Sequence, residues 1–105
     1  MAEREIVIKL RKYIEDLKKS GISVNKAYLY GSYAEGTMNS DSDIDLLIVS
    51  DDKMDPDTKA SIAWKLTGKT DSRIEPYLVS LKKFEEDEIS PIILSVKRFG
   101  IEITN

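Results

Sequence analysis

Cysteine and histidine are both missing from this sequence of 105 residues. Without them the protein has no cysteine nucleophile, no imidazole general base and no zinc site of the usual Cys/His type. Disulfides are excluded for the same reason, so the fold depends on a hydrophobic core, for which 41% hydrophobic residues are enough. The lack of cysteine also fits a reducing compartment.

Long apolar runs are missing as well. No segment approaches the roughly 18–20 residues that span a membrane, and the charged start MAEREIVIKLRK lacks a signal-peptide pattern, so we expect a cytoplasmic protein. The formal net charge of −3 disfavours duplex nucleic acid as the main ligand, because such binding usually needs a basic face. A small triphosphate remains compatible, since metal ions bound with it would neutralise carboxylates locally.

Helix and strand signals alternate along the chain, without an internal repeat or a linker. Residues 3–20 carry apolar side chains three and four positions apart, which predicts an amphipathic helix that ends at Gly21. The segment 43–50 is apolar on both faces after Asp45, so we expect it to be a strand inside a sheet. Two further strands are expected, at 25–30 and 72–80.

Two longer helices are predicted by an N-cap residue followed by proline, at Asp55-Pro56 and at Ser90-Pro91. We expect the first to stop near residue 67, with Gly68 behind it. The second is expected to end at Gly100.

The remaining signals complete the expected fold. Ser80 is expected to cap a short helix over residues 81–88, and the tail 101–104 to add a brief edge strand. Residues 1–105 are therefore predicted to form a single α/β domain with a small mixed sheet of three to five strands flanked by helices.

Asp43 and Asp45 stand two positions apart at the start of the expected strand 43–50. Their carboxylates should project from one face, ~6.6–6.8 Å apart along the backbone. Two neighbouring carboxylates repel, and burying them without compensation is costly. This arrangement favours cations, and two magnesium ions would also organise an in-line phosphoryl displacement. Taken alone, the pair is equally compatible with a solvated turn of capping aspartates.

Gly31-Ser32 follows the expected strand 25–30 and precedes a short helical turn. Glycine lets the backbone approach a ligand, and free amides at a helix start bind phosphate oxygens. The serine hydroxyl adds another donor. An isolated Gly-Ser pair is more often an ordinary tight turn, so its meaning depends on the residues around it.

Glu75 is a charged residue within the expected strand 72–80. Alternation places it on one face with Arg73 and Tyr77. On a strand beside the two aspartates it would be a third acidic group, able to ligate a metal and to take the proton of an incoming hydroxyl. The alternative is a surface glutamate paired with Arg73. Pro76 cannot donate to a ladder, which favours an edge strand or a bulge.

A longer pattern emerges from two segments, Gly31-Ser32-Tyr33-Ala34-Glu35-Gly36 and Ser42-Asp43-Ile44-Asp45-Leu46. This pattern of Gly-Ser, a nearby glycine, a spacer and Ser-Asp-x-Asp-Leu resembles the nucleotidyltransferase superfamily that includes DNA polymerase beta. Within it, the chain looks like the minimal nucleotidyltransferase branch, found in prokaryotic two-gene modules beside a helical HEPN partner. The match covers residues 28–49, and the strand with Glu75 extends it.

The resemblance implies a nucleotidyltransferase fold and a role for each candidate residue. Gly31 and Ser32 would bind the β- and γ-phosphates of ATP or another nucleoside triphosphate. Asp43 and Asp45 would coordinate two magnesium ions, with Glu75 at the third acidic position. An acceptor hydroxyl would attack the α-phosphate and release pyrophosphate. In the toxin–antitoxin modules that the chain resembles, the acceptor would be a tyrosine of the HEPN toxin, and this chain would be the antitoxin.

Two positions depart from the family pattern. Position 35 is Glu, where many relatives carry Arg, so a contact to the triphosphate is lost. The third acidic residue is commonly Asp, and Glu75 is one methylene longer, which shifts a ligand or a base.

Two other functions compete with this one. A non-catalytic antitoxin would inhibit its partner by contact alone, although three convergent acids argue against it. Transfer to a small molecule, as in the antibiotic nucleotidyltransferases, ranks third, because the extra helical segments that bind such acceptors are not seen here. The apolar residues expected either to bind a partner or to join the core are Trp64, Ile92, Ile93 and Phe99.

Overall fold

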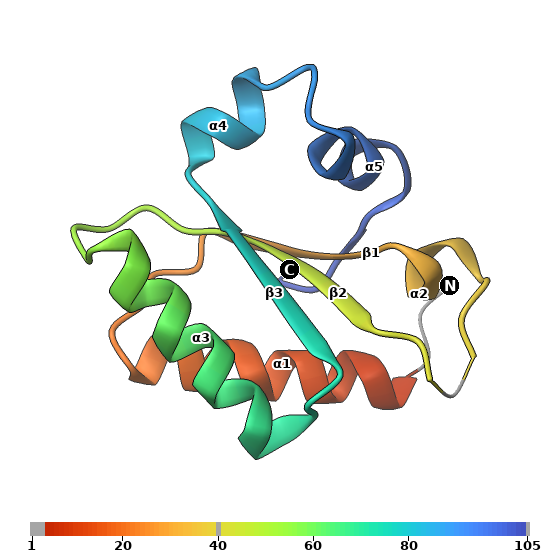
Figure 1. Cartoon of the computed structure of the whole chain (residues 1–105), viewed down its shortest axis with the longest axis horizontal. Helices are drawn as coiled ribbons and strands as arrows, with labels where there is room; N and C mark the ends of the chain where they lie inside the picture. The colour runs from red at the N-terminus through yellow and green to blue at the C-terminus, as the bar shows by residue number, and fades with distance from the viewer. Residues whose placement is uncertain (1–3, 40, 105) are drawn as a thin grey trace.

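A four-stranded mixed sheet forms the centre of the computed structural model, which describes residues 4–39 and 41–104 (Figure 1). The strand order is β3-β2-β1-β4, where β1 runs antiparallel to β2 and β4, and β2 runs parallel to β3. The bounds are β1 Lys26–Tyr30, β2 Ile44–Val49, β3 Ile74–Val79 and β4 Ile101–Glu102. The predicted mixed sheet is confirmed, with β2 inside it and β3 at an edge.

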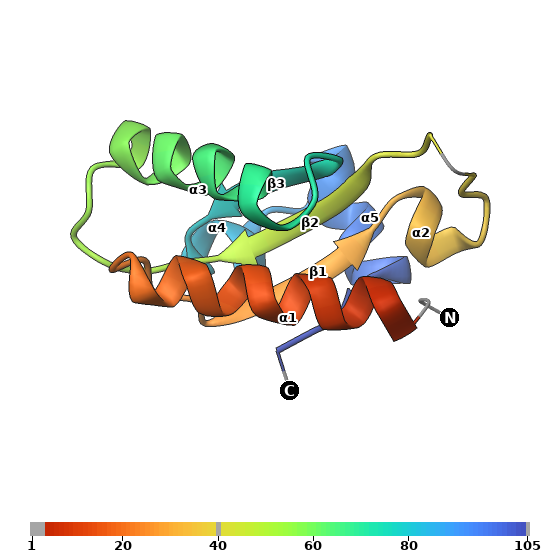
Figure 2. The ribbon, with the colours of Figure 1, turned by 90° about the horizontal axis from the view of Figure 1, so that it is seen from below.

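Helices cover both faces of the sheet (Figures 1 and 2). The long helices α1 (Arg4–Lys19) and α3 (Pro56–Thr70) pack on one face, and α4 (Leu81–Glu86) and α5 (Pro91–Phe99) pack on the other. A four-residue helix, α2 (Ser32–Glu35), follows β1. In the described part of the chain, no helix is long and apolar enough to cross a membrane.

The larger core lies between the sheet and the helices α1 and α3. Alternate residues of β2, namely Ile44, Leu46 and Ile48, meet the apolar stripe of α1 there, as the periodicities of strand and helix require. Tyr13 of α1 is fully buried, and its hydroxyl donates to the carbonyl of Ala63 in α3 at 2.6 Å. That bond joins the two helices at the centre of the core.

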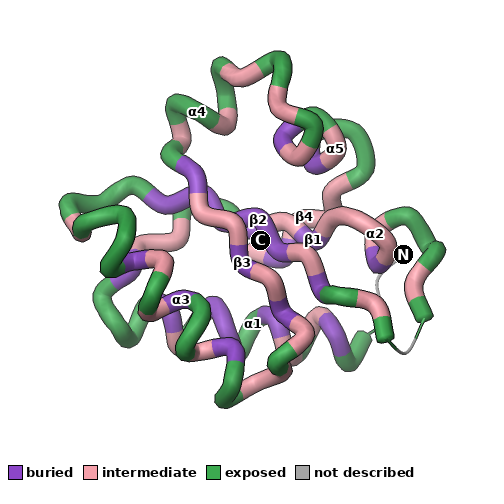
Figure 3. The backbone as a smooth tube through the Cα atoms, in the orientation of Figure 1, coloured by how far each residue is buried: buried purple, intermediate pink, exposed green. Residues whose placement is uncertain are grey.

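The opposite face of the sheet holds a smaller core beneath α4 and α5. Leu47 and Val49 of β2 are fully buried on this side. Figure 3 shows buried backbone along β2. Because β2 is covered on both faces, its sequence is apolar without alternation. Aromatic residues border this cluster, and the rings of Tyr28 and Phe84 stack with their centroids 5.3 Å apart. Asp45 precedes Leu47 by two positions, so it starts the row of side chains on this face.

The predicted end of α3 is wrong. Gly68 lies inside the helix, which continues to Thr70, and a side chain at that position would meet nothing within 4 Å. The helix ends where Asp71 takes an extended conformation and donates its N–H to the Thr67 carbonyl at 2.9 Å. Asp71 is fixed there by a local ion pair with Arg73 and by one with Lys9 of α1, a tertiary contact that the local sequence does not reveal.

The other helix boundaries are mostly as predicted. The first helix was expected from residue 3, which lies outside the described residues. The Ser80 hydroxyl accepts from the N–H of Lys83 at 3.1 Å and caps α4, although α4 stops at residue 86. Ser90 makes no side-chain cap on α5, and its backbone N–H donates to the carboxylate of Asp87 at 2.7 Å.

Candidate active site

Three acidic residues meet at the start of β2 and β3. In the parallel register of these strands, Asp45 lies directly opposite Glu75. Residues paired in this way on one face have their side chains within contact range. Asp43 precedes Asp45 by two positions and is exposed, immediately before the strand begins. The two strands therefore bring together the three acids that the sequence predicts as metal ligands.

The pKa shifts of these acids show that they interact. The pKa of Glu75 is raised, first by a hydrogen bond with Asp43, then by burial and by the negative charges of Asp43 and Asp45. The pKa of Asp45 is raised by burial and by the charge of Asp43. Partial burial and neighbouring negative charge therefore act in the same direction on both carboxylates.

The environment of Glu75 argues against the alternative of a surface pair with Arg73. The Arg73 guanidinium donates to the carboxylate of Asp71 at 2.8 Å and to the hydroxyl of Tyr33 at 3.0 Å. An ion pair with arginine would lower the pKa of Glu75, whereas the pKa is raised. Glu75 is therefore electrostatically a member of the acidic group.

Gly31 touches the acidic group from the end of β1. Its backbone has φ +72° and ψ −148°, a conformation that residues with a side chain rarely adopt. A Cβ at this position would run into the carboxylate oxygen Oδ2 of Asp45. Glycine is thus required twice, by its conformation and by the close approach of Asp45. The glycine predicted to let the backbone come near a ligand already lies against one of the predicted metal ligands.

Ser32 begins the short helix α2 directly after Gly31. The carbonyl of Gly31 accepts the N–H groups of Ala34 at 3.1 Å and Glu35 at 3.0 Å, which closes the turn. Gly36 ends α2 in the left-handed conformation with φ +79°. The strand–turn–helix arrangement expected for residues 25–36 is therefore present, beside the acids.

Tyr30 is a site residue that the sequence reading missed. It lies opposite Asp45 in the antiparallel register of β1 and β2, so Tyr30, Asp45 and Glu75 form one row across three strands. Burial, then the charges of Asp45 and Glu75 and the neighbouring Tyr77, raise the pKa of Tyr30 to about 12. Its hydroxyl is therefore protonated at neutral pH. Period-two alternation placed Tyr28 and Tyr30 on one face, but only the strand register shows which residues they meet.

The donor set of the acidic group fits magnesium, a hard cation that prefers carboxylate oxygens. A bound cation would also offset the repulsion that raises the pKa values of Asp45 and Glu75. Within residues 4–39 and 41–104, no three acidic side chains already stand in the geometry of a complete metal site. The residues that would hold the metal are therefore assigned below as a proposal.

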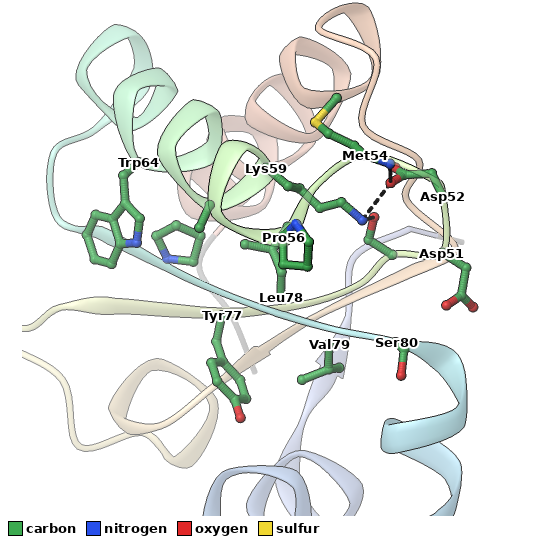
Figure 4. A pocket seen from close by; sticks show the side chains of 13 residues that line it. Asp51, Asp52, Met54, Pro56, Lys59, Trp64, Tyr77, Leu78, Val79 and Ser80 are labelled. Atoms are coloured by element: carbon green, nitrogen blue, oxygen red, sulfur yellow. Dashed lines mark hydrogen bonds and ion pairs between the residues drawn. The ribbon is translucent and has the colours of Figure 1, made fainter.

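A cavity lies at the end of the parallel strands β2 and β3 that is opposite the acidic group. It has a volume of about 430 Å³ and is lined by α3, by the loop that follows β2 and by residues 76–79 of β3. Figure 4 shows Lys59 reaching toward Asp52, and the ion pair measures 2.7 Å between Lys59 Nζ and Asp52 Oδ1. Lys59 also donates to the Ser50 hydroxyl at 3.1 Å, so this buried lysine holds the loop after β2 in place.

The apolar residues considered for a partner divide into two groups. Ile93 is fully buried and Ile92 is partly buried against the same core. Trp64 and Phe99 are 48% and 47% exposed. Only the last two remain candidates for a contact surface.

The comparison with protein families decides the assignment that the geometry suggests. The nucleotidyltransferase domain family matches residues 7–99. The chain belongs to this family. The matched range contains both strands with acids and the turn at Gly31 and Ser32, so the predicted family is confirmed.

Known proteins agree with this membership. The protein adenylyltransferase MntA of Shewanella oneidensis is 34% identical over 71 residues, which are 68% of this chain and 50% of that protein. The chain thus spans about half the length of this curated relative. A solved toxin–antitoxin structure with AMP-PNP aligns with a TM-score of 0.61 and 26% identity, over 88% of this chain and 70% of that chain.

A further solved structure contains the tri-AMPylated HEPN toxin of Shewanella oneidensis in complex with the MNT antitoxin. It aligns with a TM-score of 0.57 and 26% identity, over 91% of this chain and 69% of that chain. These alignments confirm the predicted α/β nucleotidyltransferase fold.

Proposed function

We propose that this chain is a magnesium-dependent nucleotidyltransferase that moves AMP from ATP to a hydroxyl acceptor. The observation that carries the proposal is the meeting of Asp43, Asp45 and Glu75 from neighbouring strands beside the Gly31 turn. Membership of the nucleotidyltransferase domain family supports it. Residues 1–105 act in this proposal as one minimal nucleotidyltransferase domain.

Asp43, Asp45 and Glu75 are the proposed ligands of two magnesium ions. Bound magnesium would stabilise the charge that develops on the attacking and leaving oxygens. Asp45 is the best oriented of the three ligands, because Gly31 and Glu75 restrict its carboxylate from two sides. Asp43 is exposed just before the start of β2 and lies on the solvent side of the acidic group.

The nucleotide is proposed to bind with its β- and γ-phosphates at the turn of Gly31 and Ser32. Backbone N–H groups and the serine hydroxyl are donors that suit phosphate oxygens. In this proposal the α-phosphate lies next to the acidic group. The acceptor oxygen then bonds to the α-phosphorus, the bond to the β-phosphate oxygen breaks, and pyrophosphate leaves. Glu75 takes the acceptor proton as the general base of the acidic group.

The proposed acceptor is a tyrosine of a HEPN toxin, which would make this chain an antitoxin in the cytoplasm. Support comes from the named relative, a protein adenylyltransferase, and from the structure of an AMPylated HEPN toxin with its MNT antitoxin. A nucleic acid is not the proposed acceptor, because the chain has a formal net charge of −3.

A second candidate is an antitoxin that acts by contact alone. The exposed Trp64 on α3 and Phe99 on α5 are apolar side chains available for such a contact. In this case the toxin would be inhibited without any transfer of AMP.

One experiment separates the two functions. The chain is incubated with ATP labelled at the α-phosphate, magnesium and a candidate HEPN-type partner protein. We expect label on a tyrosine of that protein, and none with the Asp43→Asn, Asp45→Asn double variant. A variant with Asp41→Asn and Asp57→Asn carries the same change in charge on exposed residues outside the acidic group and is expected to retain activity. Inhibition of the partner without label would favour the contact mechanism.

A further inference from the structure

Arg73 forms hydrogen bonds with the segment that carries Asp43 and Asp45 and with the helix that follows the Gly31–Ser32 turn. Its backbone carbonyl accepts the N–H of Ile44 at 2.9 Å, and Ile44 stands between Asp43 and Asp45. Its guanidinium nitrogen Nη1 donates to the hydroxyl of Tyr33 at 3.0 Å. Tyr33 directly follows Ser32 in α2. A single residue thus bonds to the strand start with the aspartates and to the helix behind the Gly-Ser turn.

Glu75 depends on the same residue through the chain itself. It follows Arg73 by two positions, and the bond from Ile44 to the Arg73 carbonyl fixes where β3 begins relative to β2. The register that sets Asp45 opposite Glu75 therefore starts at Arg73.

The guanidinium is held in one orientation by Asp71. Nε donates to Oδ1 at 3.1 Å and Nη2 donates to Oδ2 at 2.8 Å, a two-bonded arrangement that fixes the plane of the group. Asp71 is itself anchored from α1, because Lys9 Nζ donates to Oδ2 at 3.1 Å. Its N–H is bonded to the end of α3 at Thr67. Arg73 therefore approaches Tyr33 from a rigid base.

The helix α2 needs such a support because it is only four residues long. A helix of this length is not stable by itself and takes its position from tertiary contacts. Tyr33 is the buried residue of α2, with 4% of its surface exposed. Its hydroxyl accepts a hydrogen bond from Arg73. The orientation of the Gly31–Ser32 turn should then follow the position of Tyr33.

We propose that Arg73 is a positioning residue, which sets the Gly31–Ser32 turn against the acidic group through its bond to Tyr33. This inference rests on the proposed function only where nucleotide binding is concerned. The positioning itself is a property of the protein without nucleotide. The simpler alternative is that Arg73 only stabilises the fold through Asp71.

The first test follows the turn in the nucleotide-free protein, by NMR order parameters of the amides of residues 32–36. Tyr33→Phe removes the hydroxyl and leaves the ring in the core, and Arg73→Met removes the guanidinium. In both variants we expect the order parameters to fall from about 0.85 toward about 0.6. Lys9→Met is the matched control, because it removes a partner of Asp71 and keeps both groups of the bond between Arg73 and the Tyr33 hydroxyl. It should leave the turn rigid.

Two results of this test overturn the inference. One is a turn that stays rigid in both Tyr33→Phe and Arg73→Met, with the fold verified by circular dichroism. The other is a turn that loosens equally in Lys9→Met, because the effect would then come from general stability.

The second test measures binding of AMP-PNP and of Mn²⁺ separately by calorimetry. We expect Tyr33→Phe and Arg73→Met to weaken AMP-PNP about 10-fold, because the phosphate-binding turn is displaced. Mn²⁺ affinity without nucleotide should change less than about 2-fold, because the backbone bond between Arg73 and Ile44 remains in both variants. Equal weakening of both ligands contradicts the inference. If the unmodified chain binds neither ligand, the proposed function fails, while the order parameters still decide the positioning role.

Discussion

Asp45 and Glu75 lie side by side in the parallel register of β2 and β3, and the Cα atom of Gly31 faces the same Asp45 carboxylate. A strand pairing and a glycine turn thus restrict one carboxylate from two directions. Preorganised ligands of this kind lose little freedom when a metal binds. Each prediction below tests a consequence of this arrangement.

The metal-free protein should become more stable as the pH is lowered from about 7 toward about 5. The pKa values of Asp45 and Glu75 are raised in the folded state, so folding favours their protonated forms. The stability that they contribute is complete below their unfolded pKa values, near about 4, and is lost as the pH rises through the folded values. Thermal unfolding at a series of pH values measures the slope. Saturating magnesium should abolish it, because the metal binds the ionised carboxylates.

Other carboxylates have the opposite effect on stability at lower pH, so they set the pH range in which the acidic group can be tested. Hydrogen bonds to Lys59 and Ser23 lower the pKa of Asp52 to about 2, and Arg73 holds the pKa of Asp71 well below its usual range. Their contribution is lost as the pH falls below about 4. Asp45→Asn should flatten the profile only above that pH. An unchanged slope in Asp45→Asn would show that the acidic group does not cause the effect.

Glu75→Gln and Glu75→Asp should differ strongly. The glutamine has no carboxylate to accept a proton, so we expect label transfer to fall by about 100-fold or more. The aspartate keeps the charge but is one methylene shorter, and we expect it to retain most of the metal affinity. Steady-state rates and Mn²⁺ titration check the two expectations. Equal activity of Glu75→Gln and the unmodified chain would remove Glu75 from the mechanism.

Gly31→Ala should cost more than Gly36→Ala, although both glycines have positive φ. Alanine at 31 adopts a strained conformation and meets the carboxylate of Asp45, whereas alanine at 36 meets nothing within 4 Å. We expect a loss of about 1–3 kcal/mol of unfolding free energy at 31 from backbone strain alone, and about 1–2 kcal/mol at 36. Urea unfolding measures both. Mn²⁺ affinity should fall only in Gly31→Ala. An equal fall in Gly36→Ala would show that the close approach of Gly31 to the Asp45 carboxylate does not matter for metal binding.

The ionisation of Tyr30 reports on the acids across the strands. Its pKa of about 12 arises mainly from burial and then from Asp45, Glu75 and Tyr77. Asp45→Asn should lower this pKa without returning it to about 10, because burial remains. The Cζ chemical shift of labelled tyrosine, followed by NMR against pH, measures the change. An unaltered Tyr30 titration in Asp45→Asn would place the hydroxyl away from the acids.

Features fixed by neighbouring residues could be predicted from the sequence. The strand at β2 is legible because apolar residues follow Asp45 on both faces, and the shared face of Asp43 and Asp45 follows from the period of a strand. The position of Glu75 opposite Asp45 does not follow from the local sequence pattern. It depends on the parallel pairing of β2 with β3, in which paired residues are 30 positions apart in the sequence. The resemblance to a known family supplied that adjacency.

The features that were missed depend on contacts between distant segments. Nothing near Tyr33 indicates that its hydroxyl meets Arg73, 40 residues away. Gly68 looked like a helix end because glycine often follows one, but the helix ends at Asp71, which Lys9 of the distant helix α1 holds through an ion pair.

The most direct test of the central claim is crystallography of the chain with AMP-PNP and Mn²⁺, using anomalous scattering to locate the metal. We predict anomalous peaks bonded to Asp43 and Asp45, with Glu75 facing the same ions and the β- and γ-phosphates at Gly31 and Ser32. Peaks away from the two aspartates, or a triphosphate that does not reach the Gly31 turn, would contradict the account.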